Sequence, residues 1–286
     1  MKEYAFGIDL GGTTAKIGLF TTAGALLEKW EVPTDTSNAG EHILENLAAA
    51  IMGKMQEKAI PAEQVEGVGI GVPGPVLDSS VVPIVCANLG GWGQRNVSAQ
   101  LSGLLDGLKV LVGNDANVAA LGEIWMGAAK GCRSAVMVTL GTGVGGGAIL
   151  NGKLYTGFNY AGMEIGHFVI EHGGRLCTCG RRGCFEAYCS ATALIKRTRQ
   201  VMEEDRTSRL WELAGSLEGV NGRTPFDAAA QGDPAAGKVI DEYVDYLGCG
   251  VASLVNIFQP EVICIITVCR PGAPGAFSRW CSSRKK

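Results

Sequence analysis

The stretch YAFGIDLGGTTAKIGLF, residues 4–20, sets the pattern that decides the fold. Two apolar runs flank Gly11-Gly12-Thr13-Thr14, which predicts two strands joined by a glycine-rich turn. The pattern returns at residues 134–150, SAVMVTLGTGVGGGAIL, where Gly141-Thr142-Gly143 separates two further strand-like runs. The chain is therefore predicted to be internally duplicated, and backbone N–H groups and threonine hydroxyls of the two turns could hold opposite sides of a polyphosphate.

Working outward from these turns, the spacing of apolar residues alternates between strand and helix patterns. Helices are predicted over residues 43–55, 116–126, 190–204, 225–230 and 234–258, and further strands over residues 65–72, 109–113 and 261–266. A helix between strands favours parallel pairing. The expected fold class is thus α/β, with two lobes.

Composition and charge narrow the possible classes of function. The chain has 286 residues, of which 47% are hydrophobic, and a net charge of −3, which argues against the basic surface of a nucleic-acid binder. The strand pattern begins by Tyr4, so no signal peptide is expected and the protein is predicted to be cytoplasmic. The longest uncharged stretch, residues 134–151, is broken by five glycines, which argues against a membrane helix. The 42 glycines follow apolar runs in short clusters, which suggests backbone lying close to a ligand.

A histidine and three cysteines form the strongest local motif: His167, Cys177, Cys179 and Cys184. Thiolates and imidazole are the ligands that zinc prefers, and four of them complete a tetrahedral site with no open position. The sequence therefore predicts a structural zinc site that fixes neighbouring residues such as Glu164 and Glu186. The alternative is a reduced loop that glycines stabilise without metal.

Asn114-Asp115-Ala116-Asn117 lies where a strand passes into a helix. Asn and Asp commonly cap helices, so capping alone explains this motif. A carboxylate at the carboxyl end of a strand, in a cleft between two phosphate-binding turns, is also placed to accept a proton from an attacking hydroxyl. Glu164, His167 and Glu186 could bind a polyol, or they could support the zinc loop.

Two glycine patterns imitate a dinucleotide-binding loop, at Gly69/Gly71/Gly74 and at Gly141/Gly143/Gly146. Prolines interrupt the first, and the second leads into another strand where a helix N-terminus is required. A Rossmann fold is therefore rejected.

Taken in order, the motifs resemble those of the ROK family of sugar kinases and repressors. They are DLGGTT (residues 9–14), GNDAN (113–117), GTGVGGG (141–147), EIGH (164–167), and CTCGRRGCFE (177–186). Residues 186–193, EAYCSATA, are most similar to the bacterial glucokinase branch. The resemblance spans residues 4–265. It implies a duplicated, actin-like ATPase (ribonuclease H-like) fold with two lobes and a central cleft. It also implies a homodimer that phosphorylates a hexose with ATP and Mg²⁺.

The resemblance also implies roles for individual residues. Asp115 is expected to be the general base that deprotonates the sugar 6-hydroxyl, and His167 to share its two ring nitrogens between zinc and sugar. Sugar-binding residues are expected to be Asn88, Asn114, Asp115, Glu164, His167 and Glu186. Nucleotide- and magnesium-binding residues are expected to be Asp9, Gly11, Gly12, Thr13, Thr14, Lys16, Gly141, Thr142 and Gly143. The segment from Leu89 to Trp92 is expected to line the sugar cleft, unless Trp92 packs in the core.

Several alternatives remain at this stage. The preferred sugar could be glucose, N-acetylmannosamine, fructose or allose, and the phosphate donor could be polyphosphate. The chain could instead bind sugar without turning over ATP. The repressors of the family carry an added N-terminal helix-turn-helix domain, for which the first strand leaves no room here, so a repressor is disfavoured.

Two departures from the family pattern stand out. Met163 occupies a position where the glucokinase branch usually has glycine, so a bulky side chain is expected to enter the sugar loop and alter substrate preference. Residues 266–286 form an atypical tail, where the family continues with a turn that contacts adenosine and then a helix. Residues 269–286 show neither helical nor strand periodicity. A frame change near Ile266 is the hypothesis for this tail, which would weaken ATP binding and expose apolar residues between Val239 and Val255. The predicted domains are residues 1–115, 116–265 and the tail.

Overall fold

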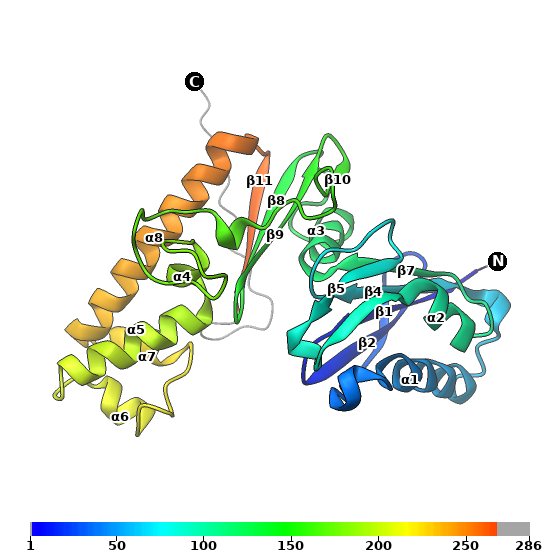
Figure 1. Ribbon diagram of the computed structural model, residues 1–286, viewed down its shortest axis with the longest axis horizontal. Coiled ribbons are helices and arrows are strands. Elements are labelled where there is room, and N and C mark those ends of the chain that lie inside the picture. The colour runs from blue at the N-terminus through cyan, green and yellow to red at the C-terminus, as the bar shows by residue number, and fades with distance from the viewer. Residues whose placement is uncertain (1, 268–286) are drawn as a thin grey trace. The chain divides into compact units, whose positions relative to one another are not determined.

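The structure is a computed structural model that describes residues 2–267 (Figure 1). Most of the predicted atypical tail, from residue 268 onward, lies outside the described residues. The strands are β1 Tyr4–Leu10, β2 Thr14–Thr21, β3 Leu26–Pro33, β4 Val65–Val72, β5 Val81–Cys86, β6 Trp92–Asn96, β7 Val110–Asn114, β8 Ala135–Leu140, β9 Val144–Leu150, β10 Lys153–Tyr155 and β11 Val262–Thr267. The α-helices are α1 Ile43–Glu57, α2 Val97–Leu104, α3 Asp115–Trp125, α4 Glu186–Cys189, α5 Ala191–Glu204, α6 Leu210–Ala214, α7 Thr224–Ala230 and α8 Pro234–Phe258.

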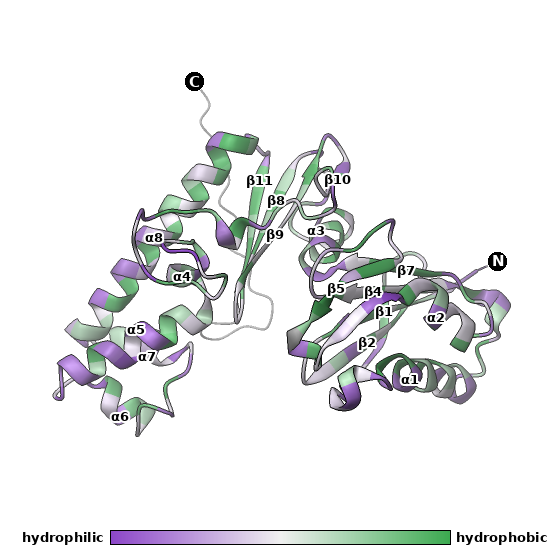
Figure 2. Ribbon diagram, in the orientation of Figure 1, coloured by the Kyte–Doolittle hydropathy of each residue, from purple (hydrophilic) through white to green (hydrophobic). Residues whose placement is uncertain are grey.

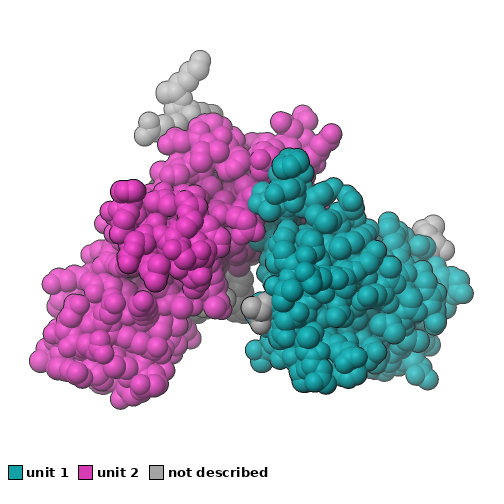
Figure 3. All heavy atoms as spheres, viewed as in Figure 1, with its two compact units in different colours: residues 1–119, 156–162 teal, residues 120–155, 163–286 magenta. Residues whose placement is uncertain are grey.

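The chain divides into two compact units, which Figure 3 colours separately. Unit 1 comprises residues 1–119 and 156–162, and unit 2 comprises residues 120–155 and 163–286. The short segment 156–162 therefore belongs to unit 1, although both of its flanks belong to unit 2. The domain boundaries predicted from the sequence remain a proposal.

Unit 1 contains a five-stranded sheet in the order β3-β2-β1-β4-β7. The pairs β1–β2 and β2–β3 are antiparallel, whereas β4 is parallel to both β1 and β7. Buried residues of the sheet pack with the apolar face of α1, which buries Ile43, Leu47 and Ile51. A separate two-stranded sheet pairs β5 with β6.

Unit 2 contains a four-stranded sheet in the order β10-β9-β8-β11. Its first three strands are antiparallel and β11 is parallel to β8, so the sheet repeats the β3-β2-β1-β4 arrangement of unit 1. This repeat confirms the internal duplication predicted from the two glycine-rich turns. β11 extends to Thr267, one residue beyond the strand predicted over residues 261–266 and within the predicted tail.

Helix α8 shows how local sequence sets an element of unit 2. Its N-terminus is fixed by Asp233, whose carboxylate accepts a hydrogen bond of 2.7 Å from the Ala236 N–H, and Pro234 occupies the first turn, where its missing N–H costs nothing. Hydrophobic and hydrophilic residues recur along the helix in Figure 2. The apolar face buries Val239, Tyr243 and Leu254 against the core of the unit.

Within residues 2–267, no helix is both long enough and apolar enough to span a bilayer.

Candidate functional site

Strand register gathers the polar residues of unit 1 at one edge of its sheet. Asp9 of β1 pairs with Gly71 of β4, and Gly71 pairs with Gly113 of β7. Asp115 follows two residues later, and a Cβ atom added to Gly71 would lie 3.5 Å from the Asp115 Cα. The carboxyl ends of three strands therefore bring Asp9 and Asp115 to the same edge.

Asn114 caps the start of helix α3, and Asp115 accepts a hydrogen bond from the residue that follows it. The Asn114 Oδ1 accepts a hydrogen bond of 3.1 Å from the Asn117 N–H, and the Asp115 Oδ1 accepts one of 2.7 Å from the Ala116 N–H. The Asn114 Nδ2 also donates to the Asp115 Oδ1 over 3.1 Å. The capping explanation is therefore correct for the start of α3, but these contacts leave the carboxyl group able to accept a further proton.

Burial raises the pKa of Asp115 above the ordinary value of an aspartate, and the negative charge of Asp9 raises it further. The hydrogen bonds from Ala116 and Asn114 oppose this rise, but they do not cancel it. A carboxylate with a raised pKa holds a proton more readily than an exposed one. Asp115 is therefore electrostatically suited to act as a general base.

The first glycine-rich turn is held by short backbone contacts. The Gly11 N–H donates to the Thr14 carbonyl over 3.2 Å, and the Thr34 hydroxyl donates to the Gly11 carbonyl over 2.8 Å. A Cβ atom on Gly12 would lie only 2.5 Å from the Asn88 carbonyl oxygen, so glycine is required there and Asn88 lies against the turn. The Lys16 Nζ lies 3.9 Å from the Asp9 Oδ2.

In the segment from Leu89 to Trp92, which was expected to line the sugar cleft, the two large side chains lie in the core. Leu89 and Trp92 are completely buried in the core of unit 1, whereas Asn88 is exposed. The alternative interpretation of Trp92, core packing, is therefore the correct one.

The second glycine-rich turn, in unit 2, is tied to the helices that follow the cysteine motif. The Ala191 N–H at the start of α5 donates to the Gly141 carbonyl over 2.8 Å, and the Thr192 hydroxyl donates to the Thr142 carbonyl over 2.8 Å. The Val144 N–H donates to the Glu186 Oε2 over 3.0 Å. The position of this turn therefore depends on α5 and on Glu186.

Met163 does not enter the sugar loop, which corrects the expectation from the sequence. Its side chain is only 7% exposed and packs in the core cluster that contains Val144 and Ile165. Its backbone has a φ of 69°, the left-handed conformation that glycine adopts without steric cost. The glycine usual at this position is thus explained by the backbone. Glu164, the next residue, precedes the short 3₁₀ turn Ile165–His167 and is exposed.

The predicted zinc ligands converge. The ligand atoms of His167, Cys177, Cys179 and Cys184 all lie within 4.8 Å of one another. The Cys177 Sγ lies 3.6 Å from the His167 Nδ1, and the Cys179 Sγ lies 3.7 Å from the Cys184 Sγ. Ligands about 2.1–2.3 Å from a tetrahedral zinc ion are about 3.4–3.8 Å apart, so this donor set fits zinc.

Glu186 joins the cysteine motif to the second turn. Its Oε1 accepts a hydrogen bond of 2.9 Å from the Thr178 hydroxyl, while its Oε2 accepts the bond from Val144. The residue therefore supports the loop of residues 171–184, as the more conservative interpretation proposed. Each carboxylate oxygen has a second lone pair that a sugar hydroxyl can use, so both interpretations remain compatible.

A cavity of about 240 Å³ lies beside the second turn. Its walls include Thr142 of the turn, Thr178 and Glu186 near the cysteine motif, and Lys196 and Arg197 of α5. Lys196 and Arg197 were not predicted as site residues, because a cation on an amphipathic helix cannot be told from an ordinary solvated residue until the neighbouring loop is placed.

The predicted site residues therefore divide between the units. Unit 1 holds Asp9, Gly11, Gly12, Thr13, Thr14, Lys16, Asn88, Asn114 and Asp115. Unit 2 holds Gly141, Thr142, Gly143, Glu164, His167, Cys177, Cys179, Cys184 and Glu186. Within each unit, the register and hydrogen bonds described above connect the turn to polar side chains.

Comparison with known proteins agrees with this arrangement. A sequence profile of the ROK family matches residues 5–267. The chain is 38% identical to a glucokinase of Thermotoga maritima over 264 residues, which are 92% of this chain and 81% of that protein. It is also 38% identical to a glucokinase of Halalkalibacterium halodurans, over 91% of this chain and 78% of that protein. Among solved structures, it is similar to a ROK family glucokinase from Streptomyces griseus in complex with glucose and AMPPNP. That match has a TM-score of 0.77 and 33% identity, and covers 92% of this chain and 83% of that one.

Proposed function

The chain belongs to the ROK family, and from this premise we propose that it transfers a phosphoryl group from ATP to glucose. The product is glucose 6-phosphate. The proposal is supported by two glucokinases that are each 38% identical to this chain over more than nine-tenths of its length. It is supported equally by the fold, which is the actin-like fold of sugar kinases.

The observation that carries the proposal is the environment of Asp115. It lies at the carboxyl edge of the sheet of unit 1, its pKa is raised by burial and by Asp9, and the turn of residues 11–14 connects β1 to β2 in the same sheet. A base is needed where the attacking hydroxyl loses its proton, because phosphoryl transfer otherwise requires mainly positioning and charge stabilisation.

In this proposal Asp115 accepts the proton of the glucose 6-hydroxyl. Asn88 and Asn114 of unit 1 and Glu164, His167 and Glu186 of unit 2 bind the remaining hydroxyls. The His167 Nδ1 is the nitrogen near the Cys177 thiol, which leaves Nε2 to interact with the sugar. Several donors and acceptors with fixed positions allow the site to distinguish hydroxyl stereochemistry.

The phosphate donor is proposed to lie against the two glycine-rich turns. Gly11, Gly12, Thr13 and Thr14 offer backbone N–H groups and hydroxyls on one side, and Gly141, Thr142 and Gly143 do so on the other. Lys16 adds a positive charge. Asp9 offers the carboxylate oxygen that Mg²⁺ prefers as a ligand, directly or through water. When bound, Mg²⁺ would offset negative charge on the transferring phosphoryl group.

Zinc is proposed to be structural. His167, Cys177, Cys179 and Cys184 supply four ligands, so no coordination position remains for substrate or water. Burial, together with the neighbouring thiols, raises the pKa of the Cys184 thiol to about 12 in the metal-free chain. Metal binding therefore releases protons, and its affinity increases with pH.

The homodimer implied by the family is also a proposal. Light scattering of the purified chain tests it, with twice the chain mass of 29.9 kDa as the expected result.

A panel of sugars tests the choice of substrate. Formation of the sugar phosphate is measured with glucose, mannose, fructose, allose and N-acetylmannosamine, first with ATP as the donor and then with polyphosphate. We expect the highest kcat/KM with glucose and ATP. A higher value for another sugar or donor would retain the kinase and reassign its substrate.

A further inference from the structure

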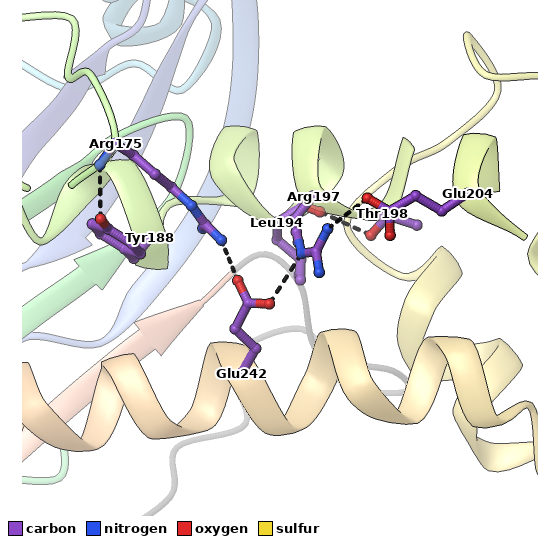
Figure 4. Close-up of polar contacts among 7 residues, drawn as sticks. All are labelled: Arg175, Tyr188, Leu194, Arg197, Thr198, Glu204 and Glu242. Atoms are coloured by element: carbon purple, nitrogen blue, oxygen red, sulfur yellow. Dashed lines mark hydrogen bonds and ion pairs between the residues drawn. The ribbon is translucent and has the colours of Figure 1, made fainter. Parts of the chain in front are cut away.

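One carboxylate connects three elements of unit 2. Glu242 of α8 binds Arg175 through its Oε1 and Arg197 of α5 through its Oε2, and the second contact measures 3.0 Å (Figure 4). In Figure 4 the two guanidinium groups approach the carboxylate from different elements above α8. The segment before Cys177, helix α5 and helix α8 are thus joined at a single side chain.

Arg175 is held on several sides. Its N–H donates to the Tyr188 hydroxyl over 2.8 Å, and its carbonyl accepts a bond of 2.8 Å from the Gly183 N–H. Its guanidinium lies 4.5 Å from the centre of the Tyr188 ring. These contacts fix the loop that continues to Cys177 and Thr178, and Thr178 binds Glu186.

Arg197 leads to a different part of the site. It lies on α5, whose first residues Ala191 and Thr192 hold the carbonyls of Gly141 and Thr142. Arg197 also pairs with Glu204 over 3.5 Å, but Glu204 is 67% exposed, so that contact is weak. Glu242 is therefore the principal counter-ion that fixes Arg197.

The three charged side chains are partly buried, so their ion pairs are less screened by solvent than those of fully exposed residues. The side chains of Arg175, Arg197 and Glu242 are 35%, 26% and 28% exposed. Both arginines also line the cavity beside Thr142. Removing the shared negative charge would leave two guanidinium groups close together without a common counter-ion, and both would be free to move into that cavity.

We propose that Glu242 is a positioning residue that places the second glycine-rich turn through Arg197 and Glu186 through Arg175. This inference rests on the proposed function, because it assigns the turn to the phosphate donor and Glu186 to the sugar. It extends that function to a residue that touches neither substrate. The connection through Arg197 reaches the turn alone, whereas the connection through Arg175 reaches Glu186, which is assigned to the sugar and also supports the turn through the Val144 N–H. The two connections should therefore differ in their kinetic effects.

The connection from Glu242 to the turn is tested by Arg197→Gln, and the connection from Glu242 to Glu186 is tested by Arg175→Gln. Arg197→Gln is expected to raise the KM for ATP about threefold or more and to change the KM for glucose less than about twofold. Arg175→Gln is expected to raise the KM for glucose more than the KM for ATP, because Glu186 is assigned to the sugar and supports the turn as well. Glu242→Gln should raise both KM values about fivefold, and Glu242→Asp, which keeps the charge, should restore at least part of each loss.

Asp241→Asn is the matched control, because it removes the same charge from the adjacent, exposed position of α8. It should leave both KM values unchanged. Equal KM values for folded Glu242→Gln and the parent chain would overturn the proposal, as would parallel changes in both KM values for Arg197→Gln and for Arg175→Gln.

A second measurement does not depend on turnover. In the zinc-loaded protein, hydrogen exchange of peptides covering residues 168–184 should be faster by about fivefold in Glu242→Gln than in the parent or in Asp241→Asn. Unchanged exchange in Glu242→Gln would contradict the positioning role. If Glu242→Gln fails to fold, the same measurement on Arg175→Gln decides, because Arg175 belongs to the segment that leads to Cys177. If the parent chain shows no kinase activity but exchange is still faster in Glu242→Gln than in the parent, the proposed function is refuted and the positioning role of Glu242 is retained.

Discussion

At the scale of single residues, Asp115 accepts hydrogen bonds from Ala116 and Asn114 and is also the proposed general base. Replacing it with asparagine keeps an oxygen that can accept the Ala116 and Asn114 hydrogen bonds but removes the basic group. Asp115→Asn is expected to lower kcat by about 10²–10⁴-fold, with the KM for glucose changed little. Steady-state kinetics measure this. Asp106→Asn, the same substitution at an exposed position of unit 1, is the control and should retain full activity.

The same substitution has a predictable effect on stability. Because burial and Asp9 raise the pKa of Asp115 in the folded chain, the unfolded chain loses this proton at lower pH. The protonated carboxyl group favours the folded chain at pH values below the pKa of Asp115 in the unfolded chain. This contribution to stability is lost as the pH rises through the pKa of Asp115 in the folded chain. At pH 7 the carboxylate therefore costs stability, and Asp115→Asn should unfold at an equal or higher urea concentration than the parent. A lower midpoint would contradict the raised pKa.

The pH dependence of the rate follows from the same pKa. Only ionised Asp115 can accept the proton, so kcat/KM should fall as pH falls through its raised pKa. The acid limb should lie above the pKa of an ordinary exposed aspartate. An acid limb in the range of a free aspartate would show that another group controls the rate.

Met163 tests the balance between backbone strain and burial. The left-handed backbone costs about 1–2 kcal/mol for a residue with a Cβ, whereas the buried methionine side chain contributes about 2–5 kcal/mol. Both Met163→Gly and Met163→Ala should therefore be less stable than the parent. The glycine variant should be the more stable of the two by about 1 kcal/mol, because only glycine relieves the strain. Urea denaturation measures this order, and an alanine variant at least as stable as the glycine variant would refute it.

How far individual residues were predictable depends on how local their roles are. The cysteine motif and the Asn114-Asp115 pair were predictable, because ligand type and spacing along the chain carry the information. The burial of Met163 and Trp92 was not, since it depends on which distant residues surround them. Glu242 could not be identified either, because both of its arginines come from other elements.

At the scale of elements, prediction succeeded where the pattern was long or repeated. Both hairpins and α8 were predicted to within one or two residues, because their apolar periodicity extends over many positions and their caps are evident. Strands β3, β5, β6 and β10 and helices α2, α4 and α6 were not predicted. β3 and β6 are rich in charged or polar residues, and β10 has only three residues, so hydrophobicity alone does not reveal them.

The cysteine loop of residues 171–184 is the element whose stability depends most on a ligand. Cys184→Ser, or removal of metal with a chelator, is expected to cost at least about 2 kcal/mol, which lowers the Tm of a chain of this size by about 4–8 °C. The Tm and the zinc content are measured together. Cys249→Ser, at an exposed position outside the cluster, is the control and should keep one zinc per chain. An unchanged Tm after complete removal of zinc would contradict a structural role.

At the scale of the whole molecule, the duplicated sheets explain why two glycine-rich turns occur in one chain. The orders β3-β2-β1-β4 and β10-β9-β8-β11 place each turn at the corresponding position of its unit. This relation was predictable because the turn motif itself repeats in the sequence. Parallel pairing was predicted from the helix between strands, but the order that places β4 between β1 and β7 was not, because it joins segments far apart in the chain. The effect of the atypical tail on ATP binding remains a prediction that the ATP dissociation constant tests.

Phosphorus NMR of the 286-residue chain with glucose, ATP and Mg²⁺ tests the central claim most directly. The account predicts that ADP and a phosphomonoester on the glucose 6-position accumulate in equal amounts, and that the Asp115→Asn chain produces neither at a comparable rate. ADP formed with inorganic phosphate and no sugar phosphate would contradict the claim. So would a folded chain that binds glucose but leaves ATP unchanged.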